Sequence, residues 1–377
     1  MDTIINVGIK TFGKPILEKV GDKTLLCNML IGDGFHWQSQ IKAILPGEIT
    51  ILDQPSESLP ESVEDNVTLV NTLPLETYLE CVVGSEMNPE APIEFLKAHA
   101  VISRSWALGK ILGVHPFGEE GKENDENRLI GWDDTSSHQG FHVCSDDHCQ
   151  RYQGLQTISQ KALEAINSTT GEVLVDRNGS LVDARFSKCC GGKTELFSTC
   201  WQSFDVNCLE SVEDPWCNLS GMPKEEKDNL LSGILKNYDV ATQGYGYRWE
   251  TQITKSEVRE NLQKKFGRNI GEIRSMEPME RGESGRIRLL RIHGTKGYLD
   301  LGKELWIRRL LSPTHLYSSA FGIDDRGEHF LISGKGWGHG VGLCQIGAAN
   351  MGARGYSYKE ILSFYYPGSH LRIKKNA

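Results

Sequence analysis

Two groups of residues in this 377-residue chain are of types that carry chemistry. The first is a single carboxylate, Glu86, which stands just before a break at 88–92 that contains two prolines. The second is a set of histidines and cysteines within the segment 137–154. A lone carboxylate can act as a general acid or base, whereas clustered thiols and imidazoles are typical zinc ligands.

Helical patterns on both sides position Glu86. Apolar residues recur at helical spacing over 75–83, which predicts a helix with Glu86 on its last turn. Each proline of the break disfavours helical geometry in the residue before it, so we expect a second helix to begin near Ile93. That helix carries a stripe of small residues, which favours close packing, and it also carries Arg104. The sequence therefore predicts a carboxylate held by two packed helices.

The second group offers more ligands than a tetrahedral zinc site requires. Cys144 and Cys149 are the strongest candidates, followed by His138 and then by His148 or His142. Two thiolates indicate a structural zinc, because hydrolytic zinc keeps an open position for water. The chain also lacks the HExxH pattern of zinc peptidases. A disulfide between Cys144 and Cys149, or two unlinked thiols, is the alternative.

A third segment of interest is the glycine run 334–342, in which every second residue is glycine. An extended run of this kind can lie flat against a partner because half its positions have no side chain. Trp337 is therefore a candidate sugar platform, and His339 and Gln345 are candidate substrate-contacting residues. A phosphate loop is not indicated, because Gly-Lys is not followed here by Ser or Thr and a helix start.

Two distant parts of the chain resemble the signatures of the SpoIID/LytB family. The first contains LPLETYLECVVGSEM and LKAHAVISRSWAL, which are similar to the family forms LPLExYLxxVVxxEM and LKAxAVxxRxxAL. The second contains GKGWGHGVGLCQIGA, which resembles GxGxGHGVGMSQxGA, and a later YKEILSFYYPG, which resembles YxxILxxYYPG. Between them, CCGGKTE resembles SSxGGxTE, with cysteines where serines are more usual. The resemblance covers the chain from about Thr72 to His370.

This resemblance implies a peptidoglycan lytic transglycosylase that cleaves the β-1,4 bond between N-acetylmuramic acid and N-acetylglucosamine. Glu86 matches the family's acidic residue, and it would act first as acid and then as base while a 1,6-anhydro ring closes. Arg104, Trp337, His339 and Gln345 would bind the sugars or orient the carboxylate. A conventional glycosidase needs two carboxylates, and Glu90 is the second one near the break.

The resemblance has two further implications. The run HCQRYQG resembles a branch of the family that holds zinc with cysteines and histidines, which favours a structural zinc at Cys144, Cys149, His138 and His148. LytB-type relatives named as amidase enhancers imply the alternative function, a non-catalytic glycan-binding activator of an N-acetylmuramoyl-L-alanine amidase. A zinc hydrolase that uses the histidine and cysteine segment is a third hypothesis, and chelation would distinguish it from a structural site.

The amino-acid composition limits the kinds of molecule that the protein is expected to bind. A formal net charge of −9 and a pI near 5.7 argue against nucleic acid and anionic membranes, which favour basic surfaces. No stretch approaches 18 apolar residues, so no transmembrane segment is expected, and the first residues lack the pattern of a signal peptide. Because peptidoglycan lies outside the inner membrane, we expect an extracytoplasmic location, in the periplasm or cell wall, with the leader removed. In that compartment the cysteines of 189–217 would form disulfides, whereas in a reducing one they would be free or metal-bound.

The expected fold is α+β, with strand-rich segments packed around the two helices and an inserted cysteine and histidine loop. We expect an N-terminal β-rich segment over 1–71 and a catalytic domain over 72–377. The latter includes the acidic and Cys/His insertion 118–154 and an α and β portion, 224–312, without evident chemistry. A helix over 255–266 is expected to begin with a capping box. The arginines of 286–291 alternate with apolar residues, as on the solvated face of a strand.

Overall fold

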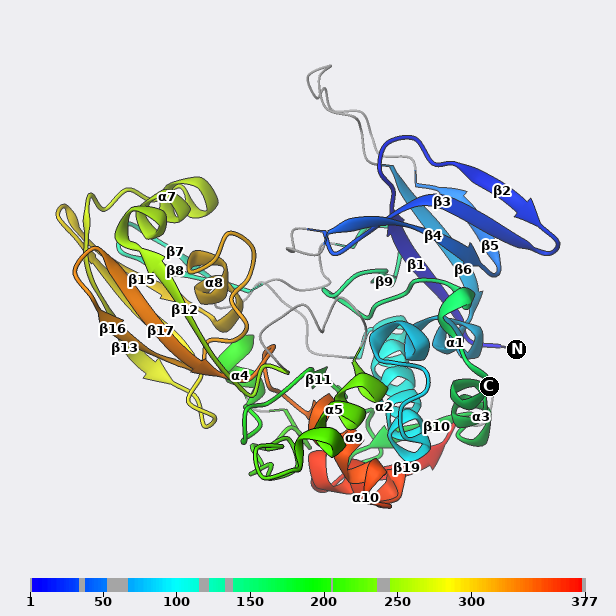
Figure 1. The fold of residues 1–377 in the computed structure, drawn as a ribbon. Helices are drawn as coiled ribbons and strands as arrows, with labels where there is room; N and C mark the ends of the chain where they lie inside the picture. The colour runs from blue at the N-terminus through cyan, green and yellow to red at the C-terminus, as the bar shows by residue number, and fades with distance from the viewer. Residues whose placement is uncertain are drawn as a thin grey trace. The chain divides into compact units, whose positions relative to one another are not determined.

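The computed structural model describes residues 2–33, 38–52, 67–114, 122–132, 138–204, 206–235 and 245–374. Its helices and small sheets confirm the α+β class (Figure 1). Within the described ranges, no helix is both long and apolar enough to span a membrane. The chain forms two compact units: unit 1 comprises Met1–Phe117, Asp134–Asp183 and His370–Ala377, and unit 2 comprises Gly118–Asp133 and Ala184–Ser369.

Unit 1 contains a four-stranded sheet, in the order β5-β6-β1-β9, and a three-stranded sheet, β2-β3-β4. In the first sheet β6 is antiparallel to β5 and β1, while the short β9 is parallel to β1. These strands are β1 (Ile4–Lys10), β2 (Leu17–Val20), β3 (Lys23–Ile31), β4 (Ser39–Leu45), β5 (Glu48–Ile51), β6 (Thr68–Pro74) and β9 (Val143–Cys144). The predicted N-terminal β-rich segment therefore lies in the same unit as the two predicted helices.

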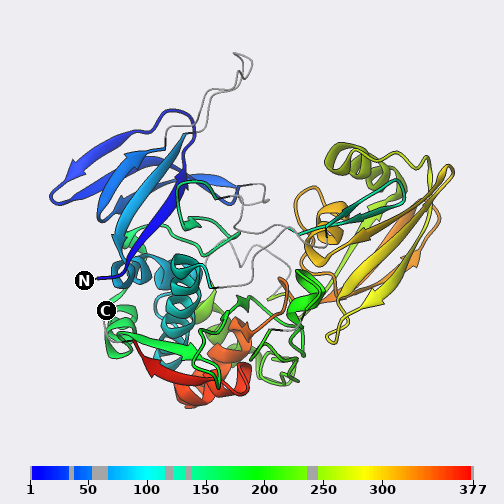
Figure 2. The same ribbon diagram turned by 180° about the vertical axis from the view of Figure 1, so that it is seen from behind.

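Both predicted helices are confirmed. α1 (Leu75–Glu86) follows β6 directly with Pro74 as its N-cap, and Glu86 is its last residue. α2 (Ile93–Leu112) ends at Gly113, whose φ of +63° suits a glycine at a helix end. Both views show α1, α2 and α3 (Gln160–Ser168) side by side (Figures 1 and 2). The 3₁₀ turn η2 (Leu155–Thr157) precedes α3, and β10 (Glu172–Val175) pairs with β19 (His370–Ile373).

Unit 2 contains a five-stranded sheet, β13-β14-β15-β8-β7, and a three-stranded sheet, β12-β17-β16. Apolar side chains of both sheets and of the helices α7 and α8 form one buried core. The predicted capping box is confirmed at the start of α7, where Thr254 and Glu257 bond each other's backbone N–H. The elements are β7 (Glu123–Asn124), β8 (Arg128–Ile130), β12 (Arg248–Thr254), α7 (Lys255–Phe266), β13 (Ile273–Arg281), β14 (Ile287–Gly294), β15 (Gly297–Gly302), α8 (Glu304–Leu310), β16 (Phe321–Asp325) and β17 (His329–Lys335).

The rest of unit 2 surrounds the glycine run. It comprises β11 (Phe186–Ser187), α4 (Phe197–Cys200), α5 (Lys224–Ile234), β18 (Leu343–Cys344), α9 (Gln345–Ala353) and α10 (Tyr358–Tyr365). β11 and β18 pair in parallel, which brings the segment after Ser187 beside the start of α9.

The glycine run is not a continuous extended strand, contrary to the sequence expectation. β17 ends at Lys335, and Gly336, Gly338, Gly340 and Gly342 all have positive φ, between +70° and +93°. A Cβ on Gly342 would lie 2.0 Å from the carbonyl oxygen of Arg185. These glycines therefore allow the chain to approach its own backbone closely, in a conformation that other residues rarely adopt.

Arg286 corrects a second expectation, because it is fully buried rather than on a solvated strand face. Its guanidinium donates to the carbonyl oxygens of Gly338, at 3.0 Å, and Cys190, at 3.3 Å. It also donates to Ser284 Oγ at 2.8 Å, and that hydroxyl donates to the buried carboxylate of Glu195 at 2.6 Å. This network fixes the glycine run against the segment after β11.

Candidate functional site

Glu86 is a buried carboxylate at the C-terminal end of α1, with 6% of its surface exposed. Its Oε1 accepts a 2.7 Å hydrogen bond from the backbone N–H of Arg151. The neighbouring Ser85 Oγ accepts a 3.1 Å bond from the backbone N–H of Gln153. Two adjacent residues of α1 are therefore attached to one short segment, 151–153. A Cβ on Gly84 would lie 2.4 Å from the carbonyl oxygen of Thr157, so the end of α1 also packs closely against the backbone at Thr157.

Tyr78 forms part of the surroundings of Glu86. Its hydroxyl donates to Gln150 Oε1 at 3.0 Å, and its ring stacks on Tyr152 with centroids 5.6 Å apart. Burial raises the pKa of Tyr78 well above 10, and the negative charges of Cys149 and Glu86 raise it further. Tyr78 therefore remains a neutral hydrogen-bond donor at physiological pH.

The four expected metal ligands lie together in unit 1. The ligand atoms of His138, Cys144, His148 and Cys149 all lie within 4.8 Å of one another. His148 Nδ1 is 3.8 Å from the sulfur of Cys144 and 3.6 Å from that of Cys149, which is 4.0 Å from His138 Nε2. Ligands of a tetrahedral zinc lie about 3.6 Å apart for sulfur and nitrogen, given the usual bond lengths. The donor set and its spacing therefore fit zinc.

His142 does not join this cluster, which resolves the choice between it and His148. Its Nδ1 accepts a 2.9 Å hydrogen bond from the backbone N–H of Asn6 in β1. The loop is anchored elsewhere by Asp146, whose carboxylate accepts bonds from the backbone N–H groups of Gly32, at 3.1 Å, and Asp33, at 2.7 Å. The cluster thus lies on a loop fastened to the N-terminal sheets.

The cluster of candidate metal ligands is joined to Glu86 through two residues of chain. Cys149 is followed by Gln150, which accepts from Tyr78, and by Arg151, which donates to Glu86. The side chain of Arg151 also donates from Nε to Asp147 Oδ1 at 2.6 Å, within the cluster loop. The loop and Glu86 are therefore linked by a backbone hydrogen bond two residues after Cys149.

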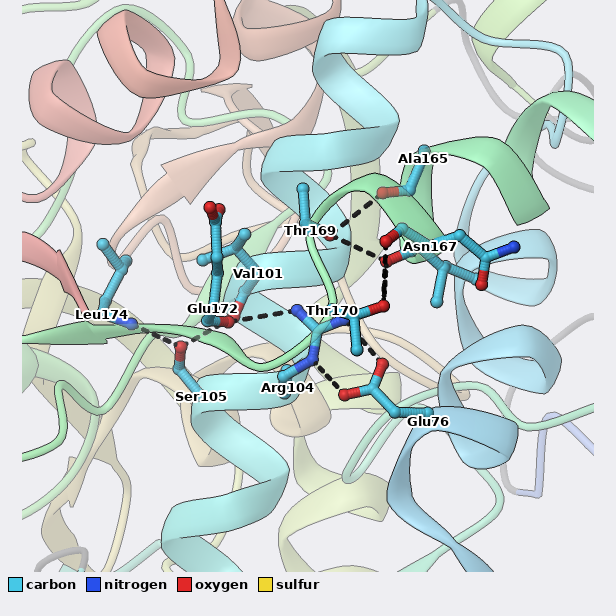
Figure 3. A network of polar contacts seen from close by, with 11 residues as sticks. Glu76, Val101, Arg104, Ser105, Ala165, Asn167, Thr169, Thr170, Glu172 and Leu174 are labelled. Atoms are coloured by element: carbon cyan, nitrogen blue, oxygen red, sulfur yellow. Dashed lines mark hydrogen bonds and ion pairs between the residues drawn. The ribbon is translucent and has the colours of Figure 1, made fainter. Parts of the chain in front are cut away.

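Arg104 lies at the other end of α1 from Glu86. Its Nε and Nη2 atoms each donate a 2.8 Å bond to the carboxylate of Glu76, and Nη1 donates to the carbonyl oxygen of Glu172 at 3.1 Å (Figure 3). Next to it, Ser105 Oγ accepts from the backbone N–H of Leu174 at 2.9 Å. Glu76 and Glu86 are ten residues apart, about 15 Å along a helix. Arg104 therefore joins α2 to the first turn of α1 and to β10.

Trp337, His339 and Gln345 belong to unit 2. Trp337 is half-buried, exchanges two backbone hydrogen bonds with Cys189, and contacts the edge of the Tyr317 ring at 5.7 Å between centroids. Gln345 is the first residue of α9 and is buried. Trp337 and His339 belong to the glycine run and Gln345 begins α9, all three in a different unit from Glu86.

His339 is held as a neutral imidazole. Its Nδ1 accepts a 3.0 Å bond from the backbone N–H of Val341, which assigns the ring proton to Nε2. Burial lowers the pKa of His339 well below 6.5, and the positive charges of Arg185, Arg286 and Arg308 lower it further. The ring also meets the edge of Trp201 at 5.0 Å between centroids. At neutral pH this side chain can donate a hydrogen bond but carries no charge.

The residues that the sequence did not single out are those brought in by the tertiary fold. Tyr78, Gln150 and Arg151 all stand within the quoted family motifs, but nothing in those motifs indicated that they meet at Glu86. A second cluster, formed by Cys190, Asp214, Cys217 and Cys344, is fully buried in unit 2. For that cluster a weak signal was available, because Cys344 stands where the family pattern has serine.

Comparisons with known proteins agree with the family resemblance. Residues 63–175 match the model of the stage II sporulation protein family, and residues 195–342 match a domain of unknown function, DUF8618. An uncharacterized protein of Brachyspira hyodysenteriae is 29% identical over 81% of this chain and 68% of its own length. Stage II sporulation protein D of Bacillus subtilis is 26% identical over 80% of this chain and 75% of its own length.

A further relative carries a different name. The amidase enhancer of Bacillus subtilis is 26% identical over 78% of this chain, which spans 40% of the length of that protein. The region matched by the family model includes the helix that carries Glu86 and the segment that carries the candidate metal ligands. The family model over residues 63–175 and these relatives together confirm the resemblance to the SpoIID/LytB family.

Proposed function

We propose that this chain acts on the bacterial cell wall as a peptidoglycan lytic transglycosylase, with Glu86 as its acid and base. The observation that carries the proposal is the placement of Glu86 as a buried carboxylate at a helix end, oriented by the backbone N–H of Arg151. Similarity to the SpoIID/LytB family supports a role in the cell wall. The proposal places the protein outside the inner membrane, where peptidoglycan lies.

In this proposal Glu86 carries out both proton transfers. As the acid it protonates the glycosidic oxygen that leaves from N-acetylmuramic acid. As the carboxylate it then accepts the proton of the muramic 6-hydroxyl, whose oxygen attacks the anomeric carbon and closes the 1,6-anhydro ring. No water enters the product, so a second carboxylate is not required. Glu90, the alternative partner, is exposed on the break between α1 and α2.

The cluster of His138, Cys144, His148 and Cys149 would hold a structural zinc. Bound there, the metal would cross-link the loop, and it would supply no step of the reaction. The loop's own residues would orient Glu86, because the loop leads into Arg151, whose backbone N–H donates to that carboxylate. Two thiolates and two imidazoles complete a tetrahedral shell, which supports a structural rather than hydrolytic site.

Residues of the glycine run are proposed to bind sugar. Trp337 would offer its ring to a sugar face, and neutral His339 and Gln345 would donate or accept hydrogen bonds. Arg104 is assigned a positioning role, because its guanidinium pairs with Glu76 and orients α1 against α2. That pairing supports a scaffold function better than direct sugar contact.

The test uses purified peptidoglycan, both intact and amidase-treated, with products identified by mass spectrometry. Wild type is expected to produce 1,6-anhydromuramic ends on at least one of the two glycans, and Glu86→Gln is expected to produce none. Glu90→Gln is the matched control, because it removes an exposed carboxylate only four residues away and should leave the products unchanged. Loss of activity in both variants would instead indicate a two-carboxylate glycosidase.

A second candidate function is favoured by the relative named amidase enhancer. In that case the chain would bind glycan and increase the activity of an N-acetylmuramoyl-L-alanine amidase without cutting the strand. Wild type that binds both glycans and leaves them uncut would reject the transglycosylase proposal. An amidase rate that rises equally with wild type and with Glu86→Gln would then support the enhancer.

A further inference from the structure

We propose that unit 2 contains a second, structural zinc site, formed by Cys190, Asp214, Cys217 and Cys344. This inference does not depend on the proposed function, since it concerns a cluster in unit 2 and no catalytic residue. All four residues are buried, with between 0 and 1% of their surfaces exposed. Their ligand atoms lie within 4.8 Å of one another.

The distances between the ligand atoms fit a shared metal. The sulfurs of Cys190 and Cys217 are 3.5 Å apart, and the Cys190 sulfur is 3.1 Å from Asp214 Oδ2. Two sulfurs on a tetrahedral zinc lie about 3.8 Å apart, given zinc–sulfur bonds of about 2.3 Å. A disulfide would bring the sulfurs to about 2.05 Å. The ligand atoms therefore have the spacing of metal ligands, and Cys190, Cys217 and Cys344 are free thiols rather than members of a disulfide.

Backbone N–H groups point at these sulfurs in the manner of the outer shell of a zinc–thiolate site. Cys344 Sγ accepts from the N–H of Cys190 at 3.3 Å and from that of Gly347 at 3.5 Å. Cys190 Sγ accepts from the N–H of Gly192 at 3.4 Å. Such bonds favour thiolates and stabilise the excess negative charge of a site with several thiolates.

Asp214 gives an independent indication of a cation. Its Oδ2 accepts a 3.1 Å bond from the hydroxyl of Tyr365, and its Oδ1 accepts from the backbone N–H of Trp216 at 2.9 Å. In the part of the chain that the structure describes, no lysine or arginine forms an ion pair with this carboxylate, although only 1% of its surface is exposed. Burial of a charged carboxylate is costly unless an opposite charge or metal balances it. A zinc ion among the four ligands would supply that charge.

The fold assembles the site from three separate parts of the chain. Cys190 follows β11, Cys344 is the last residue of β18, and the parallel pairing of these two strands brings both cysteines together. Asp214 and Cys217 come from the loop that pairs with the segment after Cys190, through the backbone bond from Asp214 N–H to the Gly192 carbonyl oxygen. A metal here would cross-link the start of α9 to the segment after β11. The metal would thus fix the C-terminal end of the glycine run, which stands just before Cys344.

Zinc stoichiometry tests the proposal on the full chain, purified under reducing conditions and measured by elemental mass spectrometry. Wild type is expected to hold about two zinc ions per chain. Cys190→Ser and Cys344→Ser are each expected to hold about one, whereas Cys200→Ser should still hold two. Cys200 is the matched control because it is a buried cysteine of the same unit outside the cluster. The double variant Cys144→Ser with Cys149→Ser removes the first site and should retain one zinc.

A spectroscopic measurement keeps the test independent of the folding of core variants. The wild-type chain and the Cys144/Cys149 double variant are loaded with cobalt(II), and thiolate-to-cobalt absorption is expected in both. Its absence from the double variant would overturn the proposal, as would wild type with a single zinc that the double variant loses. Mass spectrometry that finds a Cys190–Cys217 disulfide, or Cys190→Ser that keeps two zinc ions, would also overturn it. None of these outcomes bears on whether Glu86 cleaves glycan, so the two proposals fail separately.

Discussion

Arg151 donates its backbone N–H to Glu86 Oε1 over 2.7 Å, so a hydrogen bond links the proposed acid to the segment that follows the candidate metal ligands. Glu86→Gln keeps an acceptor for this N–H, so we expect its free energy of unfolding to change less than that of Glu86→Leu. Glu86→Leu removes the acceptor, and a buried donor left without its partner costs about 1–3 kcal/mol. Urea unfolding of both variants measures the difference. Equal losses in the two variants would mean that the charge of Glu86, rather than its acceptor role, stabilises the fold.

Removal of zinc from the first cluster should act on the same hydrogen bond. We expect chelation, or Cys144→Ser, to increase the hydrogen-exchange rate of the Arg151 amide and to abolish glycan cleavage together, because the loop loses its cross-link. The readout is hydrogen exchange at residues 150–153, with cleavage measured on the same sample. If cleavage stops while the Arg151 amide stays protected, the metal takes part in the chemistry, as in the zinc-hydrolase hypothesis.

Arg104 offers a test of the positioning role. Arg104→Met leaves the carboxylate of Glu76 and the carbonyl of Glu172 without their donor, and we expect a loss of about 3 kcal/mol of stability. The value lies at the low end for a broken buried pair because Glu76 is 39% exposed. Cleavage per folded molecule should persist, measured at a temperature well below the melting point of the variant. A raised KM with unchanged kcat would instead assign Arg104 to substrate binding.

His339 should impose a pH dependence on stability. Its pKa in the folded chain is well below 6.5, so below about pH 6.5 the unfolded chain binds a proton that the folded chain does not. The free energy of unfolding should therefore fall as pH drops below that value, at up to about 1.4 kcal/mol per pH unit, and be unaffected above it. Urea unfolding at pH 5 and pH 7 should show a smaller difference for His339→Gln than for wild type. His370→Gln, at an exposed histidine, is the control and should keep the wild-type difference.

Much of the local structure could be predicted from the sequence. The two helices around the break at 88–92, the capping box of Thr254 and Glu257, and the grouping of the four candidate ligands of the first cluster all depend on residues close together in the chain. Helical periodicity, caps and proline breaks act over a few residues, so they can be recognised in the sequence without knowledge of the tertiary structure. Glu86 itself was identified through its family signature rather than through its spacing.

Only the tertiary structure decided which distant residues meet. The sequence around Arg104 predicts a helix but not whether the side chain contacts a sugar or Glu76. Likewise, the alternation of arginines and apolar residues could not distinguish a solvated arginine from the fully buried Arg286. The cysteines of the second cluster carried a weak signal, but their convergence follows from the pairing of β11 with β18, which joins Cys190 to Cys344 across 154 residues. Such contacts are set by the burial of whole elements against one another. The sequence therefore determined the helices and indicated the candidate acid and the candidate ligands of the first cluster, whereas packing decided which side chains support them.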